Sequence, residues 1–318
     1  MDRAPDGPVI VIAGPTASGK SDAALAVAEE FGGAVINADS MQVYRELDVI
    51  TARPRFPATV RVPHLLYGFL PASEACSVGQ WLERAARAVD ETRAMGRVPV
   101  VAGGTGLYLK ALMEGLSAIP EPPIEAREEA RSLHAELGGE AFRDRLAELD
   151  PTAAARLPAG DTQRLIRAYE VVLGTGRTLG DWQKEAPVVA PVTGPFLTIA
   201  IVPPRDRLYA AIDARFGRMV EEGGLDEVRR LVGLGLDPGL PAMKAVGVRE
   251  LAAFLAGETT LEGAVESAQK ASRNYAKRQF TWLRHQFDAD LMIDAQYSES
   301  KKDEIFSFIR QFGLTAQS

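Results

Sequence analysis

The stretch that decides the fold of this chain is Gly14-Pro15-Thr16-Ala17-Ser18-Gly19-Lys20-Ser21. It has the pattern G-x-x-x-x-G-K-[ST], follows an apolar run at 9–13 and precedes a helical stretch at 21–28. Glycines between a strand and a helix let backbone N–H groups converge on an anion, to which Lys20 adds a full positive charge. The Ser21 hydroxyl suits a Mg²⁺ ion bound to the same phosphates. The pattern predicts a phosphate-binding loop over these eight residues, and most loops of this kind hold ATP or GTP.

Two further strand-like runs end in segments that carry polar groups or glycines. The run 34–36 is followed by Asp39, at a place where the carboxyl end of a parallel strand meets a ligand crevice. The run 98–102 is followed by three glycines around Thr105, which would let the backbone approach a ligand closely. Taken singly, a helix N-cap explains the aspartate and a plain turn explains the glycines. Beside a phosphate-binding loop, both are predicted to line the ligand site.

Strand-like runs alternate with helical stretches at both ends of the chain but not in its middle. The runs lie at 9–13, 34–36, 65–69, 98–102, 196–202 and 291–293. We expect an α/β fold with a P-loop NTPase-like core of parallel strands, formed by 1–117 and 196–318, and an all-helical insertion at 118–195. The tail after Gln296 is polar, and we expect it to fray except for a helix that docks through apolar residues of 305–309.

Composition indicates an ordinary globular chain of 318 residues, 46% hydrophobic and 25% charged. No apolar run approaches the roughly 20 residues that span a membrane. The first residues contain no apolar signal core, so we expect a cytoplasmic protein without a membrane anchor. The single cysteine, Cys76, excludes an internal disulfide and a cysteine-based zinc cluster. Nothing in the sequence requires more than a monomer.

A series of separated blocks resembles the tRNA dimethylallyltransferase (isopentenyltransferase) family. After the phosphate-binding loop come INADSMQVYR at 36–45, TARP at 51–54, GGTGLY at 103–108, DTQRLIRA at 161–168, PAMKAVG at 241–247 and SRNYAKRQFTW at 272–282. The loop alone is not specific, but the ordered series covers nearly the whole chain. The resemblance implies transfer of a dimethylallyl group from dimethylallyl diphosphate to N6 of adenosine 37, beside the anticodon of a tRNA. It also implies Mg²⁺ as cofactor and diphosphate as the second product.

The resemblance implies that four residues take part in catalysis: Asp39, Lys20, Thr105 and Arg215. Lys20, Thr105 and Arg215 match positions that contact diphosphate, where they would stabilise the negative charge that grows on the leaving group. Asp39 matches the family's proposed base, which accepts a proton from the exocyclic amine of adenine. Asp39 and Ser21 would hold the Mg²⁺ ion. Without the resemblance, Arg215 has the pattern of a surface arginine on an amphipathic helix.

The resemblance also implies an RNA interface assembled from separate segments. The predicted tRNA-binding residues are Asp39, Ser40, Met41, Gln42, Thr105, Gln163, Arg164, Leu165, Ile166, Arg167, Arg273, Lys277 and Arg278. Those that follow the strands would meet an adenine extruded from its stack. Those at 163–167 would hold the anticodon stem-loop from the other side.

The net charge of −7 would repel RNA as a whole, so RNA binding requires local basic patches. Residues 270–284 contain five Lys or Arg and no acid. At helical spacing, one stripe is formed by Lys270, Arg273, Lys277 and Arg284, with Arg278 to its side. A solvated helix face is the ordinary explanation, and contact with RNA phosphates is the functional hypothesis.

Two other enzyme classes remain open from the residues alone. An isopentenyltransferase acting on free AMP, ADP or ATP would share the phosphate-binding loop and Asp39 but would need neither a helical insertion nor a basic stripe. A P-loop small-molecule kinase would hold ATP in the loop and use Asp39 to activate a hydroxyl. The kinase leaves the blocks around 163–167 and 273–282 unexplained.

Some positions depart from the family pattern. Ile50 stands where a glycine is common, and His64-Leu65 replaces a frequent pair of histidines. Val248 and Ser272 replace a frequent tyrosine and threonine. We interpret His64 as structural, while the sequence gives no reason for Ile50.

Overall fold

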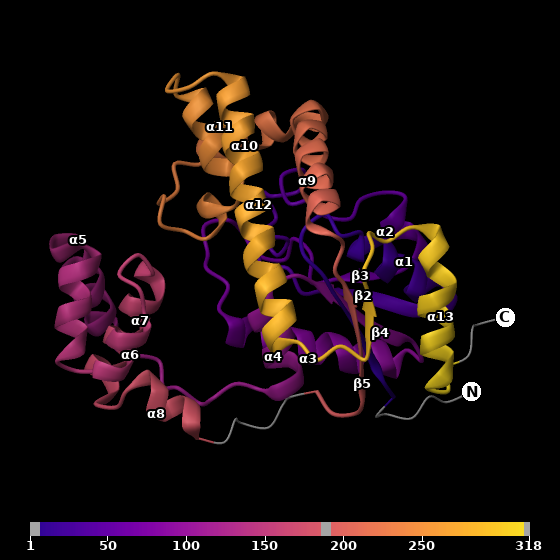
Figure 1. Ribbon diagram of the computed structural model, residues 1–318, viewed down its shortest axis with the longest axis horizontal. Helices are drawn as coiled ribbons and strands as arrows, with labels where there is room; N and C mark the ends of the chain where they lie inside the picture. Colours follow the sequence, from indigo (N-terminus) through magenta and orange to yellow (C-terminus); the bar gives the residue numbers. More distant parts are fainter. Residues whose placement is uncertain (1–6, 186–191, 315–318) are drawn as a thin grey trace. The chain divides into compact units, whose positions relative to one another are not determined.

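The chain folds into two compact units in this computed structural model, which describes residues 7–185 and 192–314. The first unit combines Met1–Met113 with Pro191–Ser318, and the second is Glu114–Ala190 (Figure 1). The second unit begins and ends a few residues before the insertion predicted at 118–195.

The first unit is built on a six-stranded sheet in which every neighbouring pair of strands is parallel. The strands are β1 (Val9–Ala13), β2 (Gly33–Asn37), β3 (His64–Leu65), β4 (Val98–Gly103), β5 (Phe196–Ile201) and β6 (Leu291–Ile293). Their order across the sheet is β3-β2-β4-β1-β5-β6. All residues of β1, β2 and β4 are buried, as a parallel sheet covered on both faces requires. The α/β, P-loop NTPase-like fold predicted from the sequence is confirmed.

Helices cover both faces of this sheet (Figure 1). The helices of the first unit, not all of which lie against the sheet, are α1 (Lys20–Glu30), α2 (Ala58–Arg61), α3 (Val78–Ala94), α4 (Gly106–Glu114), α9 (Arg205–Met219), α10 (Leu225–Val232), α11 (Val248–Leu255), α12 (Leu261–Gln286) and α13 (Lys302–Gln311). Short turns of other helix types are η1 (Val220–Gly224), η2 (Ala242–Lys244) and η3 (Glu299–Lys301). Helices α1 and α13 share one hydrophobic core with Ile10 and Ile12 of β1. The chain runs from β1 to β2 in one direction along the sheet and from β3 to β4 in the other, so right-handed crossovers place α3 on the face opposite α1.

The strand predicted at 65–69 is wrong beyond its first residue. β3 ends at Leu65, because the next residue, Leu66, has a φ of 64° and Gly68 has a φ of 56°. Left-handed backbone cannot continue a strand. The other predicted strands are present with ends that differ by a residue or two.

The second unit is helical throughout its described residues. It contains α5 (Ile124–Ala147), α6 (Pro151–Arg156), α7 (Thr162–Thr175) and α8 (Leu179–Lys184). Its core joins the first three of these helices through Phe142, Leu146, Ala153 and Leu165. Helix α5 changes direction at Gly138, whose φ of 71° interrupts the helical backbone.

The C-terminal segment is anchored where fraying was expected. The Gln296 side chain donates a hydrogen bond from Nε2 to the Ala17 carbonyl (3.2 Å), and the Tyr297 N–H donates to the Ser18 carbonyl (3.1 Å). The prediction that the tail frays from Gln296 is therefore wrong for these residues, because they pair with loop carbonyls. The predicted docking helix is α13, which buries Ile305. Within 7–185 and 192–314, we find no helix with the length and apolar character that crossing a membrane requires.

We expect Leu165→Ala to destabilise the second unit. The leucine is fully buried in its core, so truncation lowers the free energy of unfolding by about 2–5 kcal/mol. Denaturant unfolding followed by circular dichroism measures the change. The matched control is Gln163→Ala on the exposed face of the same helix, which should leave unfolding unchanged; equal effects of the two variants would contradict the packing described here.

Candidate active site

Hydrogen bonds join the loops that follow three neighbouring strands. The Gly14 N–H after β1 donates to the Gly103 carbonyl at the end of β4 (3.4 Å). The Thr105 N–H donates to the Ala38 carbonyl after β2 (3.2 Å), and the Thr105 Oγ1 accepts from the Ser40 N–H (2.9 Å). The phosphate-binding loop and the segments that carry Asp39 and Thr105 therefore lie together at one edge of the sheet, as predicted.

The phosphate-binding loop occupies the turn between β1 and α1. Ala17 and Gly19 have φ values of 64° and 87°, in the left-handed region. Lys20 is buried, and its Nζ donates to the Pro15 carbonyl (3.3 Å). The Ser18 hydroxyl is also buried and has no hydrogen-bond partner among the residues that the structure describes.

The buried Lys20, the half-buried Arg215 and two carboxylates, Asp39 and Asp22, interact electrostatically in this site. Burial lowers the pKa of Lys20 to about 8; Asp39 opposes this shift, and Arg215 of α9 adds to it. Burial also lowers the pKa of Arg215, which Asp39 and Asp22 raise and the neighbouring Arg218 lowers. Since these three cations interact with only two carboxylates, the group keeps a net positive charge that an anionic ligand can offset. A bound diphosphate would be such a ligand.

The charge of Asp39 also acts on three tyrosines, although Cys76 has a larger effect on one of them, Tyr108. Burial raises the pKa of Tyr67, Tyr108 and Tyr275, and the negative charge of Asp39 raises each further. Their phenols therefore remain neutral at physiological pH and can donate hydrogen bonds. Tyr275, on α12, also hydrogen-bonds the side chain of Thr105. No sequence pattern singled out these tyrosines, although two of them lie within blocks that resemble the family.

The glycines around Thr105 accommodate protein rather than ligand. A Cβ at Gly104 would collide with the amide of Gln279, and a Cβ at Gly106 with the ring of Trp282, both on α12. A Cβ at Gly103 would collide with the backbone that follows β2. The expectation that these glycines admit a ligand is thus corrected, because they allow α12 and the β2 loop to pack against the end of β4.

Gln279 links two of the loops directly. Its side chain is buried; Oε1 accepts from the Thr16 N–H (2.8 Å), and Nε2 donates to the Gly104 carbonyl (2.9 Å). Helix α12 thereby fixes the phosphate-binding loop relative to the end of β4. The sequence block at 272–282 contains this glutamine, but a function was predicted only for the basic residues of the block, Arg273, Lys277 and Arg278.

Gln42 and Arg215 meet at one backbone carbonyl. The Gln42 Nε2 donates to the carbonyls of Thr51 (2.8 Å) and Ala52 (3.2 Å). The guanidinium of Arg215 donates to the same Thr51 carbonyl (3.4 Å). Because both amide hydrogens of Gln42 are engaged, its side-chain oxygen is the atom that can read a base edge.

The predicted RNA-binding residues of α12 differ in availability. Lys277 and Arg278 are exposed. Arg273 is half-buried and forms an ion pair with Asp213 of α9 (2.5 Å), so its charge is largely compensated within the protein. The basic stripe therefore offers RNA fewer uncompensated charges than its sequence indicates.

The residues at 163–167 lie on α7 in the second unit. Gln163 and Arg164 are exposed, whereas Leu165 is fully buried and Ile166 packs against the same core. The predicted RNA contact is therefore corrected for the Leu165 side chain, which packs the core of this unit. Arg167 pairs with a glutamate one turn further along the helix (2.7 Å).

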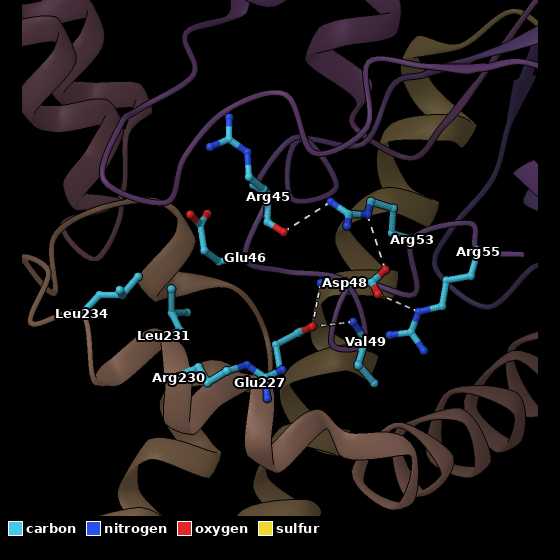
Figure 2. Close-up of a pocket in the computed structure, with 10 residues that line it drawn as sticks. All are labelled: Arg45, Glu46, Asp48, Val49, Arg53, Arg55, Glu227, Arg230, Leu231 and Leu234. Carbon is cyan, nitrogen blue, oxygen red and sulfur yellow. Dashed lines mark hydrogen bonds and ion pairs between the residues drawn. The ribbon is translucent and has the colours of Figure 1, made fainter.

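A pocket of about 450 Å³ lies elsewhere in the first unit (Figure 2). Its lining residues are Arg45, Glu46, Asp48, Val49, Arg53, Arg55, Glu227, Arg230, Leu231 and Leu234. None of the four predicted catalytic residues lines it. Asp48 forms ion pairs with Arg53 (3.4 Å) and Arg55 (2.7 Å), so two of the four arginines that line the pocket are ion-paired within the protein. We therefore assign the phosphate site to the strand ends and not to this pocket.

The residues present fit a magnesium ion only if a phosphate ligand shares it. In the described parts of the chain, no three His, Cys, Asp or Glu side chains gather as a metal site. Ser21 is exposed at the start of α1, and Asp39 accepts the Met41 N–H through Oδ1 (2.9 Å). Since Mg²⁺ typically takes substrate phosphates, waters and one or two protein ligands, this sparse set suits an ion carried by a diphosphate.

Comparison with known proteins identifies the family of this chain. The family model described as IPP transferase matches residues 42–286, and the model described as isopentenyl transferase matches residues 7–62. The chain belongs to the tRNA dimethylallyltransferase family. Its resemblance to that family, inferred from motifs, is thereby confirmed, and the chain is a prenyltransferase.

Its similarity to members of the family extends over nearly the whole chain. The tRNA dimethylallyltransferase of Rhodospirillum centenum is 56% identical over 90% of this chain and 91% of its own length. That of Paramagnetospirillum magneticum is 53% identical over 97% of this chain and 98% of its own. The solved structure of the tRNA isopentenylpyrophosphate transferase from Bacillus halodurans is 32% identical, with a TM-score of 0.69 and 96% of each chain covered.

Two departures from the family pattern have a structural explanation. Ile50 is buried with its side chain against Gly224 and Gly247, which leave room for it. It is not among the residues with positive φ, so no glycine is needed there. The Nδ1 of His64 lies 3.0 Å from the Val62 carbonyl, and burial lowers its pKa, in agreement with a structural role.

We expect diphosphate affinity to fall as the pH rises through the pKa of Lys20. Protonated Lys20 attracts the anion, and its pKa of about 8 means that the charge is lost within an accessible range. Calorimetric titration with an alkyl diphosphate should show affinity falling about tenfold between pH 7 and pH 9.5. The Lys20→Arg variant, which stays charged, should lack this dependence; an identical decline in both proteins would show that Lys20 does not titrate.

Proposed function

We propose that this chain transfers the dimethylallyl group of dimethylallyl diphosphate to N6 of the adenosine next to the anticodon of tRNA, with release of diphosphate. The observation that carries the proposal is the interaction of the buried Lys20 with Arg215 and Asp39 at a phosphate-binding loop, in a chain about half identical to tRNA dimethylallyltransferases. A cytoplasmic location and a monomeric state stay predictions.

In this reaction the phosphate-binding loop acts on a leaving group. As the C1–O bond of the allylic diphosphate breaks, negative charge grows on the diphosphate oxygens. Lys20, Arg215 and the amides at the start of α1 stabilise that charge, and their effect is strong because Lys20 is buried and Arg215 is half-buried. Thr105 adds a hydroxyl from the end of β4.

Magnesium is part of this proposal. The ion would add positive charge at the diphosphate as it leaves, and Ser21 and Asp39 are the residues that would hold it. The sparse donor set described above supports binding of the ion together with the diphosphate.

The acceptor is an exocyclic amine whose lone pair is delocalised into the adenine ring. As N6 attacks C1 and the C1–O bond breaks, a proton must leave N6, and Asp39 is the base that accepts it. Gln42 can accept a hydrogen bond from the other N6 hydrogen through Oε1, because its Nε2 is held by Thr51 and Ala52. The adenine must leave its stack to reach these groups. Exposed Lys277, Arg278 and Arg164 would then contact the RNA backbone.

The alternative enzyme classes are not favoured. An enzyme acting on free AMP would need no second unit, and a kinase would need no similarity to tRNA-modifying transferases over the whole chain.

A labelling experiment tests the function. Purified protein is incubated with Mg²⁺, radiolabelled dimethylallyl diphosphate and either unmodified tRNA or AMP. We expect label in tRNA, recovered as N6-prenylated adenosine. Label in AMP alone would instead identify a free-nucleotide enzyme, and ATP turnover without prenyl transfer would identify a kinase.

We expect Asp39→Asn to slow transfer without loosening tRNA. Removing a general base lowers kcat by about 10²-fold to 10⁴-fold, while tRNA affinity should change little because the amide keeps the shape of the side chain. Single-turnover kinetics and filter binding measure the two quantities. Asp90→Asn, at an exposed position of α3, is the control. A full-rate Asp39→Asn enzyme would exclude the general-base role.

A further inference from the structure

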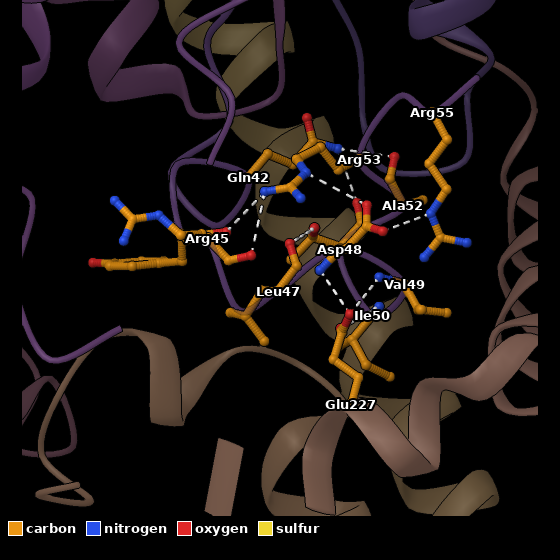
Figure 3. Close-up of polar contacts among 12 residues, drawn as sticks. Gln42, Arg45, Leu47, Asp48, Val49, Ile50, Ala52, Arg53, Arg55 and Glu227 are labelled. Carbon is orange, nitrogen blue, oxygen red and sulfur yellow. Dashed lines mark hydrogen bonds and ion pairs between the residues drawn. The ribbon is translucent and has the colours of Figure 1, made fainter. Parts of the chain in front are cut away.

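A buried carboxylate that is not among the predicted site residues holds a loop that leads to the predicted site. Glu227, on α10, is only 3% exposed. Its Oε2 accepts hydrogen bonds from the N–H groups of Asp48 (2.8 Å) and Val49 (2.8 Å), and its Oε1 accepts from the Ile50 N–H (3.0 Å) (Figure 3). One side chain thus binds three consecutive amides of a loop that is almost 180 residues away in sequence.

These bonds compensate for burying the charge. An isolated buried carboxylate is strongly unfavourable, whereas a carboxylate that accepts several backbone N–H bonds is stable. The loop at 48–52 contains no strand or helix. Turn hydrogen bonds such as that from the Ala52 N–H to the Val49 carbonyl (3.0 Å) shape the loop internally, and Glu227 ties its backbone to α10.

The same loop passes directly to the predicted site. The next two carbonyls, those of Thr51 and Ala52, accept both amide hydrogens of Gln42. The Thr51 carbonyl also accepts from the guanidinium of Arg215. Ala52 has a φ of 48°, in the sterically restricted left-handed region, so the direction of these carbonyls is closely defined.

We propose that Glu227 is a positioning residue for this site. By holding the amides at 48–50, it places the Thr51 and Ala52 carbonyls, which in turn orient the Gln42 oxygen toward the acceptor base and the Arg215 guanidinium toward the diphosphate. The identity of these two ligands rests on the proposed function, but the chain of hydrogen bonds from α10 to the two side chains does not.

Glu227→Gln is the variant that tests the proposal. The amide keeps the size of the side chain but replaces one acceptor oxygen with a donor, so at least one loop N–H loses its partner. Misplacement of Gln42 and Arg215 should lower kcat/KM for tRNA by about 10-fold to 100-fold. Asp226→Asn is the matched control, because it removes an exposed carboxylate from the next position of the same helix and should leave kcat/KM unchanged.

A double-mutant cycle separates positioning from a general loss of structure. Because Glu227 is proposed to act through Arg215 as well as through Gln42, the double variant Glu227→Gln/Gln42→Ala should lose less activity than the product of the two single losses. Multiplying effects of the two substitutions would overturn the proposal, because they would show that the residues act independently.

Hydrogen exchange tests the arrangement without any transfer assay. In the unmodified protein, the amides of Asp48, Val49 and Ile50 should exchange slowly although they lie in a loop, and in Glu227→Gln this protection should be lost while that of β1 remains. If Glu227→Gln does not fold, Glu227→Asp, which keeps the charge but shortens the reach, replaces it. Rapid exchange of the three amides in the unmodified protein would refute the proposal, whether or not the protein prenylates tRNA.

Discussion

The interaction on which this structure depends is the electrostatic attraction of Asp39, at the end of a parallel strand, for the buried Lys20 and the half-buried Arg215 of α9. The sheet order places β1 between β4 and β5, so the phosphate-binding loop lies beside the segments that follow the neighbouring strands. Burial lowers the pKa of both cations and Asp39 opposes the shift. The site thereby keeps an excess of positive charge. In the proposed reaction a diphosphate ligand would offset that charge, and the same cations would stabilise it as a leaving group in the transition state.

Elements from the last third of the chain hold this arrangement in place. Helix α12 inserts Gln279 between the phosphate-binding loop and the end of β4, and Tyr275 one turn earlier bonds to Thr105. Helix α10 holds the loop at 48–52 through Glu227, and Tyr297 pairs with the phosphate-binding loop itself. Groups predicted to contact the ligand thus come mainly from strand ends, while groups that fix their positions come from segments far along the sequence. The catalytic geometry therefore requires both ends of the chain.

The sequence predicted the parts that local patterns encode and missed those that long-range pairs create. A phosphate-binding loop has a fixed spacing, and Asp39 and Thr105 follow apolar runs, so strands and ligand-facing loops could be read directly. Gln279 and Glu227 bond to backbone atoms distant in sequence, and no spacing or periodicity signals such a bond. The glycines around Thr105 were assigned to ligand because their protein neighbours on α12 could not be foreseen. The strand predicted at 65–69 failed for a related reason, since apolar composition does not reveal a left-handed backbone at Leu66.

The most direct test is a crystal structure with Mg²⁺ and a non-hydrolysable thio analogue of dimethylallyl diphosphate. We predict that the diphosphate lies in the loop at 14–21, in contact with Lys20, Thr105 and Arg215, with the allyl group directed toward Asp39. A diphosphate bound instead in the pocket lined by Arg45 and Arg230 would contradict this assignment, because Lys20 and Arg215 would then have no part in stabilising the leaving group.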